Sequence, residues 1–204
     1  HITIRQCSMN DGHGSVVIGS EIGAGVRDLT VRDCIFKDTD RGLRIKTRRG
    51  RGEDCVVDRV AFENIRMDGV LTPFVVNCFY FCDPDGRTEY VQSKEPLPVD
   101  ERTPSIQELS FKDIHAENAH YAAVCAYGLP EQKIGHLKFE NISVSYAPQV
   151  QPEIPAMMDG LEPMAKAGIV ARNVRLLTLK NVDIKGCAGD PVQAENVETI
   201  ENRE

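Results

Sequence analysis

One histidine and a pair of basic residues are the side chains best placed to do chemistry in this chain. His13 lies between two glycines, and Arg44 and Lys46 lie two residues apart in the segment GLRIKT. Flanking glycines allow unusual backbone angles and the close approach of a ligand. On a β-strand, Arg44 and Lys46 would point to the same side and face solvent together if Ile45 faces the interior. Arginine grips a carboxylate with two parallel hydrogen bonds and lysine acts as a point charge, so the pair suits an anionic ligand.

Positive charge is concentrated in the segment from Arg41 to Gly52. It contains six basic residues and no acidic residue, although the net charge of the chain is −7. A local basic patch on an acidic protein suggests a specific anionic ligand, whereas the negative net charge argues against nucleic-acid binding. Two simpler interpretations stay open: the segment is a solvated surface loop, and His13 is a structural residue in a turn before a buried strand.

One short pattern recurs along the chain and predicts the fold. It consists of an apolar–x–apolar strand, two polar residues that often end in Asn or Asp, and one more apolar residue. The last apolar positions are spaced by 27, 31, 49, 28 and 40 residues, and they are Cys7, Cys34, Ile65, Ile114, Ile142 and Val182. Between them lie second short strands, and alternation of period two dominates. This predicts a solenoid whose neighbouring coils pair about 4.8 Å apart, with like residues stacked into ladders.

We therefore expect a single all-β domain over residues 1–204, an irregular right-handed parallel β-helix of about six to seven coils. The two long spacings predict loops inserted at about 83–104 and 147–167. Loops of this length often wall a cleft, although tolerated surface insertions are equally consistent. The longest apolar run, residues 73–81, is too short to cross a bilayer as a helix, so we expect no membrane partner. We expect a monomer.

The seven cysteines show no tight spacing. Five of them lie in or beside apolar runs and are expected to be buried, reduced thiols: Cys7, Cys34, Cys55, Cys125 and Cys187. Cys78 and Cys82 could be metal ligands or a disulfide, but no further Cys or His lies near them, so we expect no metal and no cofactor. Unpaired cysteines favour a cytoplasmic over a secreted location.

The two candidate motifs, in this order, are similar to those of a known family. The stretch GHGSVVIGSE at residues 12–21 is followed one coil later by GLRIKTRRGRG at residues 42–52, with VRDLTVRDCIF between them. Together they resemble glycoside hydrolase family 28, the polygalacturonases, whose fold is a right-handed parallel β-helix. The resemblance covers essentially the whole chain and is strongest over residues 1–67.

The resemblance implies an activity and roles for four residues. The activity is hydrolysis, with inversion, of α-1,4 bonds between galacturonate units of pectin. His13 would support the catalytic carboxylates and bind near the cleavage point. Arg44 and Lys46 would bind the galacturonate carboxylate, and Tyr80 would contact the substrate. The expected partner is an anionic polysaccharide or oligosaccharide.

This sequence differs from the family in its catalytic carboxylates. Its acid and base lie in NTD and DD motifs ahead of Gly-His-Gly, and neither motif occurs between His1 and Asp11. An inverting glycosidase needs two carboxyl groups about 6.5–9.5 Å apart. Four acidic residues lie near the two motifs: Asp11, Glu21, Asp38 and Asp40. We assign none of them as catalytic, because their positions at turns and strand ends explain them more simply.

We therefore expect the chain to be the C-terminal part of a longer hydrolase and to be inactive alone. Exo action is expected if the 83–104 loop closes one end of the groove. Three alternatives stay open: a related substrate such as rhamnogalacturonan, a non-catalytic β-helix that binds carbohydrate or mediates adhesion, and a repeat scaffold without a ligand.

Overall fold

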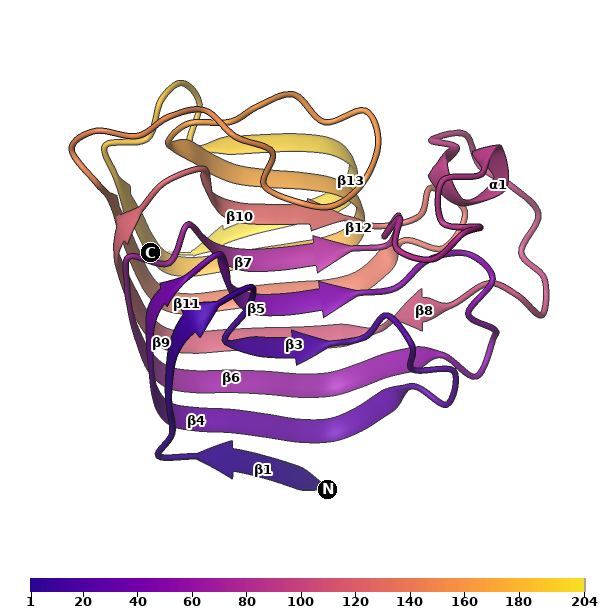
Figure 1. Ribbon diagram of the computed structural model, residues 1–204, viewed down its shortest axis with the longest axis horizontal. Coiled ribbons are helices and arrows are strands. Elements are labelled where there is room, and N and C mark those ends of the chain that lie inside the picture. The colour runs from indigo at the N-terminus through magenta and orange to yellow at the C-terminus, as the bar shows by residue number, and fades with distance from the viewer. Residues whose placement is uncertain (204) are drawn as a thin grey trace.

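Parallel strands that return to the same place at each turn of the chain build the fold (Figure 1). The computed structural model describes residues 1–203. One side of the coil, which we call the site face, carries one strand per coil. In stacking order these strands are β3 (Val16–Ile18), β5 (Arg41–Lys46), β7 (Thr72–Asn77), β10 (Ala122–Tyr127) and the first part of β12 (Ala167–Lys185).

The other sides of the coil carry the remaining strands, and the long ones among them, of 12 to 19 residues, bend around the corners. The remaining strands are β1 (Ile2–Arg5), β2 (Ser8–Gly12), β4 (Val26–Thr39), β6 (Val56–Asp68), β8 (Ser105–Ile106), β9 (Glu108–Ala119), β11 (Ile134–Tyr146), the second part of β12, and β13 (Val192–Arg203). Because β12 passes from the site face to these sides, all the strands join in one 13-stranded sheet. The predicted parallel β-helix is confirmed.

The apolar position that repeats in the sequence is a line of register partners in the structure. Cys34 pairs with Ile65, and Ile65 pairs with Ile114. Ile114 pairs with Ile142, which pairs with Val182. The three isoleucines are buried. The ladder predicted from the repeat therefore exists, although the spacings that produce it range from 28 to 49 residues.

A column of phenylalanine rings ties the site face to the opposite side of the coil. Phe111 stacks between Phe62 and Phe139, with ring centroids 5.4 and 4.8 Å apart. Phe74 of the site face meets Phe111 and Phe139 edge-on, at 5.2 and 5.5 Å. Stacked and edge-on pairs are favourable arrangements for aromatic rings and add to the free energy of burial. The strands that carry the site are thus packed against a rigid core.

Asparagine and aspartate residues make one corner of each coil. The register-matched residues there have positive φ between 50° and 56°, and they are Asp33, Asn64, Asp113, Asn141 and Asn181. Asn141 Nδ2 donates to Asp113 Oδ1 at 2.7 Å, and Asn181 Nδ2 donates to Asn141 Oδ1 at 3.0 Å. Short polar side chains tolerate this left-handed conformation better than other residues. This accounts for the Asn or Asp that ends the repeated pattern.

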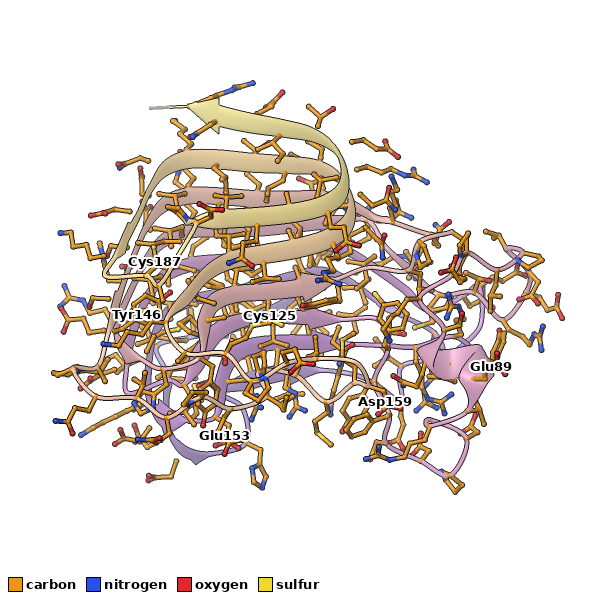
Figure 2. The ribbon with its side chains drawn as sticks, turned by 90° about the horizontal axis from the view of Figure 1, so that it is seen from above. Glu89, Cys125, Tyr146, Glu153, Asp159 and Cys187 are labelled. Carbon is orange, nitrogen blue, oxygen red and sulfur yellow. The ribbon has the colours of Figure 1, made fainter. Side chains whose placement is uncertain are left out.

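Two long segments between strands lie outside the coil. The first, residues 78–104, contains the short helix α1 (Glu89–Gln92), which projects beyond the ends of the strands (Figure 1). The second, residues 147–166, runs along the outside of the strands, where Glu153 and Asp159 are labelled in Figure 2. It covers the outer side of β7 and β10, and every residue of these two strands is buried. No helix within residues 1–203 has the length and apolar character to span a bilayer.

We predict that replacing Asn141 separates the backbone and hydrogen-bond contributions of the corner ladder. Asn141→Ala loses both ladder hydrogen bonds and puts at φ 54° a residue that tolerates the left-handed region less well than Asn, so it should lower the free energy of unfolding by about 2–3 kcal/mol. Asn141→Gly loses the same hydrogen bonds but adopts this φ readily, so its loss should be smaller. Urea denaturation measures both, and an equal loss for the two variants would contradict the role given to the backbone conformation.

Candidate functional site

The Gly-His-Gly turn connects β2 to β3 and presents His13 to solvent. Gly12 has φ +121°, a conformation that residues with a side chain rarely adopt. A Cβ on Gly14 would lie 2.5 Å from a methyl carbon of Val17. The two glycines thus allow a tight turn close to β3, and the side chain of His13 is 90% exposed.

Arg44 and Lys46 lie on the outer side of β5, while Ile45 between them is buried in the core. The predicted alternation along this strand is therefore present. The expectation that both cations face solvent is wrong for Arg44, which is only 8% exposed. Its Nη2 atom donates to the sulfur of Met157 at 3.1 Å, since residues 147–166 fold back over this part of the site face.

The four residues singled out from the sequence line one cavity of about 580 Å³. Its lining residues are His13, Gly14, Val17, Asp40, Arg41, Arg44, Lys46, Tyr80 and Met157. Three successive coils and the second long segment contribute these residues. His13 and Val17 come from the first coil, Arg44 and Lys46 from the second, and Tyr80 from the third.

The register between coils explains this meeting, with one correction to the predicted spacing. His13 and Arg44 are separated by 31 residues, one coil of the repeat, which predicts that they are neighbours on the same face. The first coil is instead offset by 27 residues, so Val17 pairs with Arg44, and the residue opposite His13 is Asp40. Arg44 still reaches the turn, because its Nη1 donates to the backbone oxygen of His13 at 3.4 Å.

Tyr80 lies beneath both cations. Its backbone N–H donates to the oxygen of Thr47, and its ring centroid lies 4.3 Å from Lys46 Nζ and 5.6 Å from Arg44 Cζ. A cation over an aromatic face is attracted by the ring's electron density. Burial raises the pKa of Tyr80, with a further contribution from a hydrogen bond involving Cys82. The phenol therefore stays neutral beside the two cations.

Most of the basic segment is structural, contrary to the expectation of a basic patch for a ligand. Arg49 is 1% exposed and pairs through Nε with Glu131 at 2.6 Å. Its other nitrogens donate to backbone oxygens of residues 90–95, which anchors the first long segment. Arg48 pairs with Asp85 at 2.8 Å, and both it and Arg51 contact Asp83.

Arg44 and Lys46 differ from the other four cations of this segment. Arg41 lies 3.5 Å from the Asp40 carboxylate, so it is paired as well. Within residues 1–203, no carboxylate lies within 4.0 Å of a charged nitrogen of Arg44 or Lys46. Burial lowers the pKa of Arg44, and the neighbouring Arg41 adds to the effect. Burial also lowers the pKa of Lys46, with Arg44 as the second cause. Two unpaired, partly desolvated cations thus face one cavity.

The structure adds residues that the sequence did not single out. Asp40 Oδ2 lies 2.7 Å from His13 Nδ1. Met157 closes one side of the cavity, and Asn77 Nδ2 holds it by donating to its backbone oxygen at 3.1 Å. The 27-residue offset between the repeats at Cys7 and Cys34 could have identified Asp40. Nothing in the sequence indicates that Met157 returns to this face.

The cysteines follow the prediction only in part. All seven are free, and Cys34, Cys55 and Cys125 are buried as expected. Cys7 is exposed, because the first coil has no neighbour on its outer side within the described residues, and Cys187 is half-buried. The two remaining cysteines are a buried thiol, Cys78, and an exposed one, Cys82.

Comparisons with known proteins point to one family. A family model described as glycosyl hydrolases family 28 matches residues 1–156. The chain is similar to a probable polygalacturonase of Arabidopsis thaliana, with 32% identity over 128 residues, which is 60% of this chain and 26% of that protein. It is also similar to an endo-polygalacturonase of Pectobacterium carotovorum subsp. carotovorum, with 32% identity over 117 residues, or 57% and 24% of the two chains.

A third relative is named for exo action. The exo-poly-alpha-D-galacturonosidase of Dickeya chrysanthemi is 31% identical over 85 residues, which is 42% of this chain and 14% of that protein. The chain spans well under half the length of the curated relatives it matches. No solved structure matches it.

We predict that Arg44 contributes to the lowered pKa of Lys46. In Arg44→Gln the repulsion between the two cations is lost while the burial remains, so the pKa of Lys46 should rise part of the way toward its ordinary value. NMR titration of 13C-labelled lysine side chains measures this shift. The exposed Lys37, on β4 outside the cavity, is the internal control. An unchanged Lys46 titration would contradict the coupling.

Proposed function

The chain belongs to glycosyl hydrolases family 28, and from that membership we propose that it supplies the carboxylate-binding part of a polygalacturonase-type site. The proposed substrate is α-1,4-linked galacturonan, whose units each carry one carboxylate. One observation supports this above the others. Arg44 and Lys46 are the cations of the basic segment that have no acidic partner among the described residues, and both line the cavity.

Four of the lining side chains have a proposed role in binding the substrate. Arg44 binds the galacturonate carboxylate through its planar fork, and Lys46 neutralises the same charge from the next outward position of β5. The ring of Tyr80 supports both cations from below. His13, exposed at the other side of the cavity, meets the neighbouring sugar near the bond to be cleaved.

Catalysis needs more carboxylates than the cavity provides. Inverting hydrolysis uses two carboxyl groups, and Asp40 is the one carboxylate among the lining residues that the structure describes. Asp40 is already paired with His13 and Arg41. We therefore propose that residues 1–204 bind galacturonan and do not hydrolyse it by themselves. The same shortage favours the second candidate, a carbohydrate-binding β-helix without catalysis.

Binding of trigalacturonate by the chain tests the carboxylate site. The double variant Arg44→Gln/Lys46→Gln should bind at least about 100-fold more weakly in titration calorimetry, because two charge-assisted contacts are lost. Arg27→Gln/Lys37→Gln removes the same charge from the strand β4, outside the cavity, and is the matched control. An equal loss of affinity in both double variants would indicate non-specific charge attraction and contradict the proposal.

Incubation of the chain and of the double variant Arg44→Gln/Lys46→Gln with polygalacturonate tests the absence of hydrolysis. Assays of new reducing ends in polygalacturonate should show no release by residues 1–204. Release that the double variant abolishes would contradict the proposed shortage of carboxylates.

We further propose that the site accepts the end of a galacturonan chain. The segment of residues 154–159, here called the wall segment, closes the cavity on the side of the later coils through Met157. Arg41 and Asn77 hold its backbone in place, and Ala156 and Met158 anchor it in the core. The 83–104 loop, whose closure of the groove would also favour exo action, contributes no lining residue to the cavity within the described chain.

Polymers of different length test this end-specific binding. At equal mass of galacturonan, the number of binding sites should rise in proportion to the number of chain ends as the polymer is shortened. Met157→Gly should open the wall and let internal units bind, which weakens this dependence. Met157→Leu keeps the volume of the side chain and should bind like the unchanged protein. Binding that depends on mass and not on chain ends in the unchanged protein would contradict end recognition.

A further inference from the structure

A chain of polar contacts runs from the wall segment to His13. Arg41 donates through Nε to the backbone oxygen of Pro155 and through Nη2 to that of Ile154, both at 3.1 Å. The Nη1 atom of Arg41 lies 3.5 Å from Asp40 Oδ2. The same carboxylate oxygen lies 2.7 Å from His13 Nδ1.

The fold sets Asp40 opposite His13. Gly12 and Thr39 are register partners, and the backbone N–H of Asp40 donates to the oxygen of Gly12 at 2.9 Å. Packing does not hold the imidazole, because its side chain is 90% exposed. Asp40 is the one side chain within residues 1–203 that hydrogen-bonds the ring. The direction in which His13 points therefore depends on this contact.

The contact also selects one form of the ring. An ionised carboxylate only accepts hydrogen bonds, so Nδ1 of His13 must carry the hydrogen that it donates to Asp40. In the neutral ring, Nε2 then has a free lone pair, because the bond made by one nitrogen decides the state of the other. A free imidazole would rotate and exchange between its two tautomers.

We propose that Asp40 is a positioning residue that fixes the tautomer and the direction of His13, and that Arg41 holds Asp40 in turn. This inference rests on the proposed function in one respect, namely that His13 meets the sugar. Stability is a weaker explanation for the contact. Exposed ion pairs contribute little to folding, at about 0–1 kcal/mol, and Asp40 itself is about one-third exposed. The main effect of the contact between Asp40 and His13 is to fix the tautomer and the direction of an imidazole that is otherwise unrestrained.

The tautomer of His13 gives the first test. Long-range 1H–15N correlation spectra of the 15N-labelled chain, recorded where the ring is neutral, report which nitrogen carries the hydrogen. The unchanged protein should show hydrogen on Nδ1 of His13, and Asp40→Ala should show a mixture or hydrogen on Nε2. Asp38→Ala removes an exposed carboxylate two residues away and should leave the His13 signals unchanged. The same tautomer in Asp40→Ala and the unchanged protein would overturn the inference.

A double-mutant cycle for trigalacturonate affinity gives the second test. Asp40→Ala should weaken binding by about three- to tenfold, the value of one hydrogen bond. In a His13→Ala background the same change should have no further effect, because Asp40 acts through the ring. Additive losses would show that Asp40 contacts the ligand directly and would overturn the positioning role. If the unchanged protein binds no galacturonate, the proposed function fails, while the tautomer of Asp40→Ala still decides the inference.

Discussion

The parallel register between neighbouring coils is the constraint on which the rest of the structure depends. It places a residue about 4.8 Å from its partner in the next coil, whatever length of chain connects them. Ile65 and Ile114 are 49 residues apart and still stack, because the excess chain leaves the coil as a loop. The register that orders the core also brings Val17 beside Arg44 on the outer side of the site face. The cavity is thus assembled from strands whose positions the core already fixes.

Two buried arginines of one segment differ in how their charge is compensated. Arg49 has a carboxylate and several backbone oxygens around its guanidinium, so burial leaves its charge compensated. Arg44 is nearly as buried, but it meets a backbone oxygen at 3.4 Å and a thioether sulfur, which is a weak acceptor. Burying a charge without a strong partner is unfavourable. A carboxylate entering the cavity would supply the missing acceptor for Arg44 and oppose the repulsion between it and Lys46.

The sequence predicted the parts of the structure that depend on periodicity. The repeated apolar position forms the stacked ladder through Ile65, Ile114 and Ile142. The alternation along β5 places Arg44 and Lys46 on the same side of that strand. It did not predict features that depend on contacts between distant loops. The partners of Arg48 and Arg49 come from residues 83–95 and 131. The run of cations is therefore divided into paired arginines and two cations, Arg44 and Lys46, that have no carboxylate partner among the residues the structure describes.

The path of the second long segment determines which side of the cavity is open. This segment leaves the coil after β11, yet Arg41 of β5 and Asn77 of β7 hold it, so it folds back over earlier coils. Through Met157, it closes the cavity on the side of the later coils. On the other side, β3 and the Gly-His-Gly turn leave His13 and Val17 exposed. If a terminal galacturonate lies at Arg44 and Lys46 against the closed side, the next unit must extend past His13. The bond between these two units then lies next to the imidazole that Asp40 orients, which places carboxylate recognition and the proposed cleavage point on adjacent coils.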